Sequence, residues 1–249
     1  MKNTMRDNIQ FYTSLMSGKV KRKIIGVQNR FSYENVANNP SVKKYLIPFL
    51  KNQIQPSDNV LDYGCGNGIL LPIISQFCIG GGGVIGFDIV PVFIDAARDL
   101  LLKNNIKNSS VYSAAEFNES FKENYFDVVI VNDVLHHMDN PKEAVENIYK
   151  LLKPDGKLII LEPNRLNPAI LILHAADPNE QKWLKMGYFK YYENITRPLF
   201  KIIKKDWSPL VYGPSSRLVL LMAEISENFP FKLLRWILPR LYLIFKVIK

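Results

Sequence analysis

The chain has 249 residues, of which 47% are hydrophobic and 22% are charged, and its formal net charge is +9. This length allows one domain with a good core, or one domain with a cap. No apolar run reaches the roughly 18 uncharged residues that a membrane-spanning helix requires, and the first residues lack the apolar region of a signal peptide. We therefore exclude an integral membrane protein and predict a cytoplasmic one.

Cysteine and histidine are rare in this chain. The two cysteines, Cys65 and Cys78, do not suggest the disulfide framework of a small secreted protein. Two of the three histidines, His136 and His137, are adjacent, and no histidine has the spacing of a metal site. The sequence therefore predicts no metal.

Charge is unevenly distributed along the chain. Residues 1–60 carry 10 basic and 3 acidic residues, residues 61–180 carry 9 and 16, and residues 181–249 carry 13 and 4. Such asymmetry can steer an anionic substrate, an anionic membrane surface or a nucleic acid toward the basic flanks. A lysine-rich solvated surface explains it equally well.

The order of apolar and helix-length segments predicts an α/β fold. A helix is expected from about Ser41 to Gln53. From Asn59 onward, apolar runs of strand length alternate with segments of helix length, which indicates a parallel sheet with crossover helices. The strands are expected at 59–63, 83–87, 109–113, 126–131 and 156–162.

Two of the crossover helices begin with recognisable sequence signals. Pro91 suits the first turn of one helix, because its missing N–H would be unpaired there in any case. Asn140, Pro141 and Glu143 supply a cap, a first-turn proline and a capping-box acid for another. We expect this second helix to continue to about Lys153.

A glycine-rich loop follows the first predicted strand. Gly64, Gly66 and Gly68 alternate with other residues, and glycine leaves no Cβ where a ligand must lie against the backbone. Asp88 ends the next predicted strand, where an acid can accept hydrogen bonds from both ribose hydroxyls. A dinucleotide fingerprint would need glycine at position 69, which is Ile69. The pattern favours a nucleoside ligand over a dinucleotide.

This loop resembles motif I of the class I S-adenosylmethionine-dependent methyltransferases, and Asp88 is similar to the ribose-binding acid of that family. Four more motifs follow in the family's order, so that the resemblance covers about residues 57–163. Their type is similar to the ubiquinone and menaquinone methyltransferases that act on small or lipid-like molecules. After the glycine loop and Asp88 they are Ala114–Glu116, Tyr125–Asn132, Leu135–His137 and Leu151–Ile160.

The resemblance implies a doubly wound, Rossmann-like α/β fold. Its mostly parallel seven-stranded sheet would have an antiparallel C-terminal strand, with a helical N-terminal segment and a helical insert before that strand. The sixth strand is expected at Tyr188–Thr196 and the seventh at Leu241–Ile248. We expect a helical cap over 1–55, a core that binds S-adenosylmethionine over 56–196, a helical insert that caps the substrate over 197–239 and the final strand over 240–249.

The resemblance also implies which residues bind S-adenosylmethionine. The glycine-loop backbone would lie along its methionine and ribose, and Asp62 would hold that loop or the amino group. The family's usual acid near the adenine is replaced by Ala114, which leaves Glu116 or a backbone carbonyl for that role, and Asn132 would lie beside the transferred methyl group. The implied cofactor-binding set is Asp62, Gly64, Cys65, Gly66, Gly68, Asp88, Ile89, Ala115, Glu116 and Asn132.

Both acids of this set also have a structural interpretation. Asp62 could cap a turn, and Asp88 could cap the helix that begins at Pro91. Because both acids lie close to the glycine loop in the predicted fold, we favour their interpretation as cofactor ligands.

A base would be needed if the methyl acceptor is a hydroxyl group. His136, His137 and Glu162 all lie at carboxyl ends of predicted central strands, within reach of a ligand bound there. We choose His137 first as the catalytic base. A histidine here could equally pack the following helix.

The sequence therefore predicts a methyltransferase for a small, lipid-like or sugar-linked acceptor. Residues 217–225 and 231–238 are apolar, and residues 229–249 carry five basic residues and no acid, which suggests peripheral membrane contact or, alternatively, packing on the sheet or over the substrate. Two other functions stay open. An RNA methyltransferase could use the basic flanks, although no RNA-binding module accompanies the core, so we do not expect a nucleic-acid partner. A non-catalytic scaffold that binds the cofactor would fit the missing acid at position 114.

Overall fold

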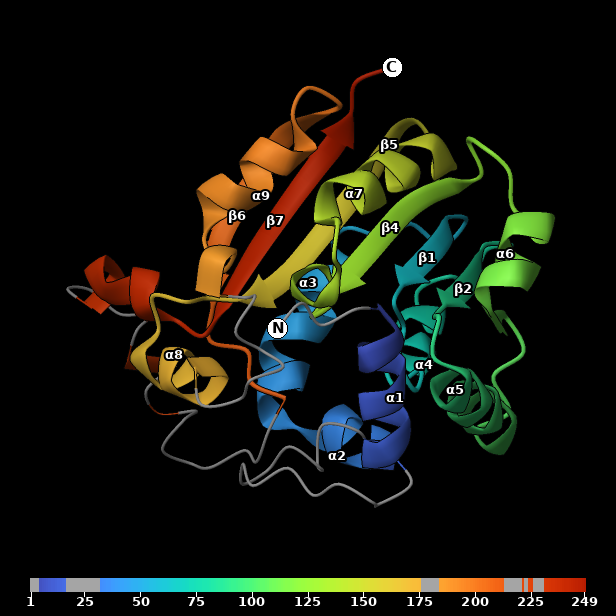
Figure 1. The fold of residues 1–249 in the computed structure, drawn as a ribbon, viewed down its shortest axis with the longest axis horizontal. Coiled ribbons are helices and arrows are strands. Elements are labelled where there is room, and N and C mark those ends of the chain that lie inside the picture. The colour runs from blue at the N-terminus through green and yellow to red at the C-terminus, as the bar shows by residue number, and fades with distance from the viewer. Residues whose placement is uncertain (1–4, 17–31, 176–183, 213–220, 222–223, 226–230) are drawn as a thin grey trace.

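The computed structural model describes residues 5–16, 32–175, 184–212, 221, 224–225 and 231–249. These residues contain a seven-stranded sheet with the strand order β3-β2-β1-β4-β5-β7-β6. Strands β1 to β5 are parallel, and β7 is antiparallel to both of its neighbours (Figure 1). The strands are β1 Asn59–Tyr63, β2 Gly83–Phe87, β3 Ser109–Tyr112, β4 Phe126–Asn132, β5 Leu152–Pro163, β6 Phe200–Ser208 and β7 Arg240–Val247.

Helices cover both faces of the sheet (Figure 1). One face carries α2 Tyr33–Asn38, the π-helical turn Val42–Leu46, α3 Ile47–Lys51, α4 Leu71–Ser75 and α5 Pro91–Lys103, and the other carries α6 Ala114–Ser120, α7 Pro141–Leu151 and α9 Phe189–Thr196. The remaining helices are α1 Met5–Met16, η3 Leu135–His137, α8 Pro168–Ala175 and η5 Phe231–Ile237, of which η3 and η5 are 3₁₀-helices.

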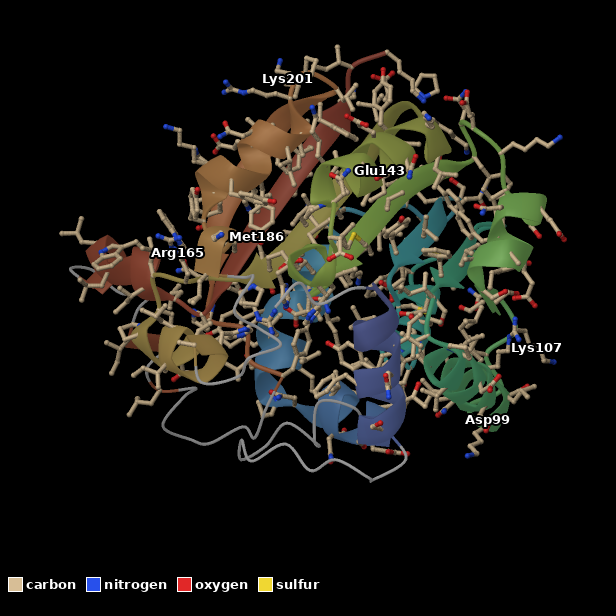
Figure 2. The ribbon with its side chains drawn as sticks, viewed as in Figure 1. Asp99, Lys107, Glu143, Arg165, Met186 and Lys201 are labelled. Atoms are coloured by element: carbon tan, nitrogen blue, oxygen red, sulfur yellow. The ribbon has the colours of Figure 1, made fainter. Side chains whose placement is uncertain are left out.

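Alternate side chains along each strand point to opposite faces of the sheet. In β4, Val128 and Ile130 join the apolar cluster under α3 to α5, whereas Val129 and Val131 join the cluster under α7. All four are at most 1% exposed, as expected for a parallel strand covered on both sides. Helix α5 shows the matching pattern, because Ala97 is buried against the sheet while Asp99 points away from it (Figure 2).

The five parallel strands that the sequence predicted are confirmed, with small differences at their ends. The predicted helix over Ser41–Gln53 is also present, as the turn Val42–Leu46 followed by α3. Val42, Leu46 and Leu50 are fully buried and recur at every fourth position, which is the spacing of one helix face.

The predicted cap of α7 is confirmed as well. The Asn140 side chain accepts a hydrogen bond from the backbone N–H of Glu143, and Pro141 occupies the first turn. The helix ends at Leu151, two residues before the expected Lys153.

The predicted sixth strand at Tyr188–Thr196 is wrong, because these residues form helix α9. Their aromatic and β-branched side chains favour a strand, but the buried residues Tyr192 and Thr196 are four positions apart, so one helix face packs on the sheet. The helix stops at Thr196 because Arg197 precedes Pro198 and is therefore held in an extended conformation.

The sixth strand is instead β6, which lies at the edge of the sheet. Its residues from Lys201 to Lys205 are exposed, so the sequence lacks the alternating apolar pattern of a half-buried strand. The lysines along this edge, such as Lys201 in Figure 2, disfavour pairing with a further strand.

The seventh strand is confirmed as β7, which begins at Arg240. The predicted insert over 197–239 therefore contains a strand of the sheet as well as the helical turn η5. Most of the apolar stretch 217–225 lies outside the described residues. The division of the chain into cap, core and insert stays a prediction.

Candidate functional site

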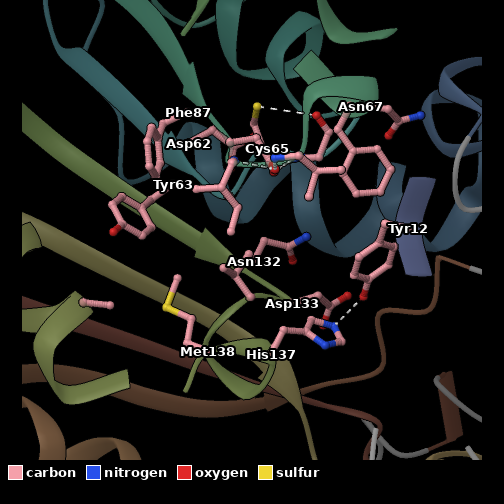
Figure 3. Close-up of a pocket in the computed structure, with 18 of the residues that line it drawn as sticks. Tyr12, Asp62, Tyr63, Cys65, Asn67, Phe87, Asn132, Asp133, His137 and Met138 are labelled. Carbon is pink, nitrogen blue, oxygen red and sulfur yellow. Dashed lines mark hydrogen bonds between the residues drawn. The ribbon is translucent and has the colours of Figure 1, made fainter. Parts of the chain in front are cut away.

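A cavity of about 560 Å³ lies at the carboxyl ends of β1, β2 and β4. This volume is within the range of pockets that hold small ligands. Its walls are the glycine loop, the loop after β2, the end of β4 with η3, the first turns of α7, helix α1, and Tyr212 (Figure 3). Eight residues of the predicted site line it: Asp62, Gly64, Cys65, Gly66, Asp88, Ile89, Asn132 and His137.

The glycine loop is fixed against the neighbouring strand. The backbone N–H groups of Gly64 and Cys65 donate to the carbonyl oxygen of Phe87 over 2.8 and 2.9 Å. Gly64 has φ +82°, and a Cβ added there would lie 2.6 Å from a methyl carbon of Val134. Gly66 has φ +55°, and a Cβ there would meet nothing within 4 Å. The backbone at Gly66 thus faces open cavity, as a ligand that lies against the loop requires.

The Asp88 carboxylate ties the glycine loop to the start of α5. Its Oδ2 accepts the Gly66 N–H over 2.8 Å, and its Oδ1 accepts the N–H groups of Ile89 and Val90 over 2.8 and 2.9 Å. Burial raises the pKa of Asp88, and these three hydrogen bonds oppose that rise. A carboxylate has about four acceptor sites, so capacity remains on the cavity side. The capping and ligand interpretations of Asp88 are therefore compatible.

Asp62 is a buried acid in the cavity wall, with only 2% of its surface exposed. Burial, followed by the charge of Asp88, raises its pKa to about 7. Among the described residues no hydrogen-bond donor reaches its carboxylate. A cationic ligand group beside Asp62 would supply the missing partner.

This pKa predicts that Asp62→Asn stabilises the unliganded protein at high pH. The unfolded state ionises Asp62 near pH 3.8, whereas the folded state keeps the proton until about pH 7. The folded state therefore loses stability as the pH rises between these values, by at most about 4 kcal/mol above pH 7. Thermal unfolding of the variant and of the exposed control Asp99→Asn measures the effect. We expect an increase in Tm at pH 8 that vanishes near pH 4, and an equal increase at both pH values would contradict the assignment.

The end of β4 brings together residues from distant parts of the chain. Asn132 Oδ1 accepts a hydrogen bond of 2.8 Å from the hydroxyl of Tyr212. The next residue, Asp133, has φ +56° and forms an ion pair with Arg240. The Arg240 guanidinium lies over the Tyr212 ring, 4.8 Å from its centroid. Burial raises the pKa of Tyr212 well above its usual value, so the phenol stays protonated.

The three candidate catalytic residues occupy different positions. His137 lines the cavity, and its Nε2 lies 3.1 Å from the hydroxyl of Tyr12 in α1. His136 is 2% exposed, and its Nδ1 lies 2.5 Å from Oε2 of the fully buried Glu162. The other oxygen of Glu162 accepts the backbone N–H groups of Val134 and Leu135. Of the three, only His137 faces the cavity.

Glu162 and His136 therefore act on the position of η3. The carboxylate fixes the turn between β4 and η3 through both backbone N–H groups and the His136 ring. A buried acid with these partners is a structural anchor rather than a base in contact with ligand.

Three residues of the predicted cofactor set lie outside the cavity lining. A Cβ on Gly68 would lie 2.7 Å from that of Ala97, so this glycine allows α5 to approach the loop. Glu116 and Ala115 belong to the first turn of α6. Glu116 caps that helix at Ser113 and pairs with Arg98, and these contacts lower its pKa to about 2, the Ser113 hydrogen bonds first. A contact of Ala115 or Glu116 with the adenine stays a prediction.

Several residues that line the cavity were not predicted from the sequence. Tyr12 lies 5.3 Å from Phe93, ring to ring, and so helix α1 closes one side of the cavity. Tyr212 follows β6, and Met138 follows η3. Only Met138 stands next to a recognised motif, so a single sequence held no signal for the others.

The cavity is strongly acidic. Five acids line it, and none of its described lining residues is lysine or arginine: Asp62, Asp88, Asp133, Asp139 and Glu143. Low-dielectric walls of one charge sign raise the local concentration of the opposite ion, so this cavity favours a cation.

Two kinds of feature are absent from the described residues. No cluster of three or more His, Cys, Asp or Glu side chains could hold a metal ion there. Within the same residues, every helix is too short or too polar to traverse a bilayer.

Comparison with known proteins identifies the family. A family model for the methyltransferase domain matches residues 35–200. The ubiquinone biosynthesis O-methyltransferase of Rickettsia bellii is 33% identical over 136 residues, which are 54% of this chain and 55% of the relative. The ubiquinone/menaquinone biosynthesis C-methyltransferase of Vibrio campbellii is 33% identical over 109 residues, 43% of this chain and 42% of the relative. The chain thus spans about half the length of these relatives.

Solved structures of low sequence identity share the fold. A methyltransferase from Aquifex aeolicus that depends on S-adenosylmethionine has a TM-score of 0.59 at 15% identity, over 87% of this chain and 99% of that one. The [4+2]-cyclase SpnF has a TM-score of 0.56 at 15% identity, over 81% and 80%. Because a cyclase shares it, the fold alone does not decide the reaction.

The family model covers more than half of the chain, and the glycine loop, Asp88 and the sheet order agree with it. The chain therefore belongs to the methyltransferase domain family, as a class I member with S-adenosylmethionine as its cofactor.

Proposed function

We propose that this protein transfers the methyl group of S-adenosylmethionine to an oxygen atom of a small, lipid-like aromatic acceptor of the quinone type. The observation that carries the reaction is the cavity itself, which His137 lines together with the glycine loop, Asp62 and Asp88. The acceptor class rests on the relatives, whose names place them in ubiquinone biosynthesis.

The residues of the loop and of β1 and β2 fit the cofactor. S-adenosylmethionine supplies a methyl group that is already activated by its sulfonium, so the protein needs mainly to orient the partners. The open backbone at Gly66 would receive the methionine part, and Asp88 would accept from a ribose hydroxyl. Asp62 would pair with the ammonium group, which would relieve the cost of its buried charge.

The acceptor side is served by His137. An attacking hydroxyl must lose its proton, and the imidazole of His137 takes it. Tyr12 holds the ring at Nε2, and the anchor formed by Glu162 and His136 holds the turn that carries it. In this proposal Glu162 and His136 are positioning residues, and His137 is the one catalytic residue of the three.

The acidic lining argues against RNA as the acceptor. Asp133 is neutralised by Arg240 and the pKa of Asp62 is raised to about 7, but the other acids of the lining repel a phosphate backbone and do not repel an uncharged aromatic ring. The basic flanks of the chain lie outside this lining. A turnover assay distinguishes the enzyme from a non-catalytic scaffold, because a scaffold forms no methylated product.

Incubation with deuteromethyl S-adenosylmethionine and a membrane lipid extract tests the function. We expect mass spectrometry to find a labelled, methoxylated aromatic lipid. A ring-bound methyl group would instead indicate carbon methylation, and absence of any labelled product in lipid, metabolite and RNA fractions would remove the proposal.

The open space at Gly66 leads to a prediction about cofactor affinity. Gly66→Ala places a methyl group in the cavity, and we expect the Kd for S-adenosylmethionine to rise about tenfold, the loss of roughly 1.4 kcal/mol. The matched control is Gly81→Ala, because Gly81 has φ +95°, has free space for a Cβ, and lies outside the cavity lining. Both variants carry a similar backbone strain of about 1 kcal/mol. Calorimetry that finds equal Kd values for both would contradict this role of the loop.

We also propose that the protein contacts an anionic membrane surface, from which it draws a lipid-like acceptor. Six large apolar side chains on and next to α8 and η5 are 40–74% exposed. Asn164 and Asn167 hold the two elements together by donating to the carbonyl oxygens of Trp236 and Ile237 over 2.7 and 2.6 Å. The six side chains are Leu166, Leu171, Ile172, Leu233, Leu234 and Trp236.

Flotation with vesicles tests this contact. We expect the protein to bind phosphatidylglycerol vesicles more strongly than phosphatidylcholine vesicles, because the C-terminal region is basic. The double change Leu233→Ser and Leu234→Ser should reduce binding at least about fivefold, since each buried side chain contributes apolar area. The control is Ile79→Ser, a change at a side chain that is 78% exposed elsewhere on the protein. Equal binding by both variants would contradict the proposed surface.

A further inference from the structure

Four residues from three separate segments form one cluster at the end of β4, which we call the β4-end cluster: Asn132, Asp133, Tyr212 and Arg240. The methyl-transfer chemistry described above does not use Tyr212 or Arg240. Three of the four line the cavity (Figure 3 labels Asn132 and Asp133), and Arg240 contacts two of these three, Asp133 and Tyr212.

Two members of the cluster are buried, and all four are paired within it. Tyr212 is 5% exposed and Arg240 is 8% exposed. The Arg240 guanidinium forms an ion pair with Asp133 and lies over the Tyr212 ring, which holds the ring from one side. Because the two charges neutralise each other, the cluster presents the cavity with a polar but uncharged wall.

The hydrogen bond from Tyr212 determines which way the Asn132 amide faces. The Tyr212 hydroxyl donates to Oδ1 of Asn132 over 2.8 Å, so the amide oxygen is taken. The amide nitrogen then faces the cavity, where Figure 3 shows the end of the side chain directed into the space below the glycine loop. An amide nitrogen is only a donor, and among the described residues it reaches no acceptor. It is therefore aimed at an oxygen of a ligand.

We propose that Tyr212 is a positioning residue, which fixes Asn132 so that its amide nitrogen donates a hydrogen bond to the acceptor oxygen that receives the methyl group. This inference rests on the proposed function. As the O–H bond of the acceptor breaks, its proton goes to His137 and negative charge develops on the oxygen. That oxygen then forms the bond to the methyl carbon, while the electron pair of the S–CH₃ bond stays on sulfur. A fixed donor stabilises the charge at the point where it develops.

The test uses the whole chain with a catechol that carries a geranyl group as the acceptor probe. Tyr212→Phe keeps the ring under Arg240 and removes only the hydroxyl, so the Asn132 amide is free to turn its oxygen toward the acceptor. We expect kcat/KM for the catechol to fall about tenfold, while the Kd for S-adenosylmethionine stays within about twofold. The matched control is Tyr242→Phe, a change at a buried tyrosine of β7 outside the cavity lining, which should leave both constants unchanged.

A second variant separates positioning from simple packing. In the Asn132→Ala background, Tyr212→Phe should cause no further loss, because the amide that it orients is gone. An additional tenfold loss there, or an equal loss of S-adenosylmethionine affinity in Tyr212→Phe, would overturn the inference. If the unaltered protein methylates the catechol and Tyr212→Phe does so equally well, the inference fails while the proposed function stands. Only an inactive unaltered protein counts against the proposed function itself.

Discussion

Replacement of Asp88 by alanine should raise the Kd for S-adenosylmethionine at least about 100-fold. The carboxylate holds Gly66 in place and presents its remaining acceptor capacity to the ribose, and a hydrogen bond to a charged group contributes about 1.5–3 kcal/mol. The loss of one ribose contact, together with the release of Gly66 from its fixed position, therefore corresponds to a factor of 100 or more. Titration calorimetry of the purified variant measures this change.

Two further variants make the result decisive. Asp99→Ala removes an acid from the exposed side of α5 and should leave the Kd unchanged (Figure 2). Asp88→Ala also loses the hydrogen bonds to Ile89 and Val90, which lowers the stability of the protein. Asp88→Asn keeps a side-chain oxygen for these bonds, so its Tm and its Kd for S-adenosylmethionine are compared with those of Asp88→Ala. If a folded Asp88 variant binds the cofactor as tightly as the unaltered protein, Asp88 is a structural cap and nothing more.

The second large effect is expected for His137→Ala, which should lower kcat for an aromatic hydroxyl acceptor at least about 100-fold. General base catalysis contributes about 10² to 10⁴ in rate, and His137 is the candidate base that reaches the cavity. Cofactor affinity should change less than about threefold, because the glycine loop, Asp62 and Asp88 hold the cofactor. The measurement is methyl transfer to the geranyl catechol at saturating S-adenosylmethionine.

Tyr12→Phe is the companion variant for His137. It removes the hydroxyl that lies 3.1 Å from Nε2 but keeps the ring against Phe93, so we expect a loss of only about threefold in kcat. Equal activity of His137→Ala and the unaltered protein would show that the acceptor reacts without this base.

The sequence predicted the parts of the fold that depend on local patterns. The alternation of apolar strands with capped helices predicted β1 to β5 and the start of α7, because each strand is a short run between turn residues and α7 carries its own cap. It failed at α9 and β6, where aromatic residues form a helix and an exposed, lysine-rich segment pairs along its backbone with β7. Backbone pairing between distant segments leaves no periodic signal at an exposed edge.

The meeting of the glycine loop and Asp88 at one cavity was also predictable from the chain itself. The glycine loop and Asp88 are each short, local motifs, and their meeting follows from the rule that neighbouring parallel strands end at one edge of the sheet. His137 faces the cavity, whereas His136 pairs with Glu162. Because the two histidines are adjacent in the sequence, their different environments could not be predicted from it.

The amino-acid sequence by itself determined the family and the position of the glycine loop beside Asp88, because each depends on residues close together in the chain. Only the tertiary structure decided which distant residues line the rest of the cavity. Tyr12, Tyr212 and Arg240 are up to 228 positions apart along the chain, and β7 with the segment after β6 brings the last two to the end of β4. Contacts of such long sequence separation arise from the packing of the whole sheet, so no local pattern contains them.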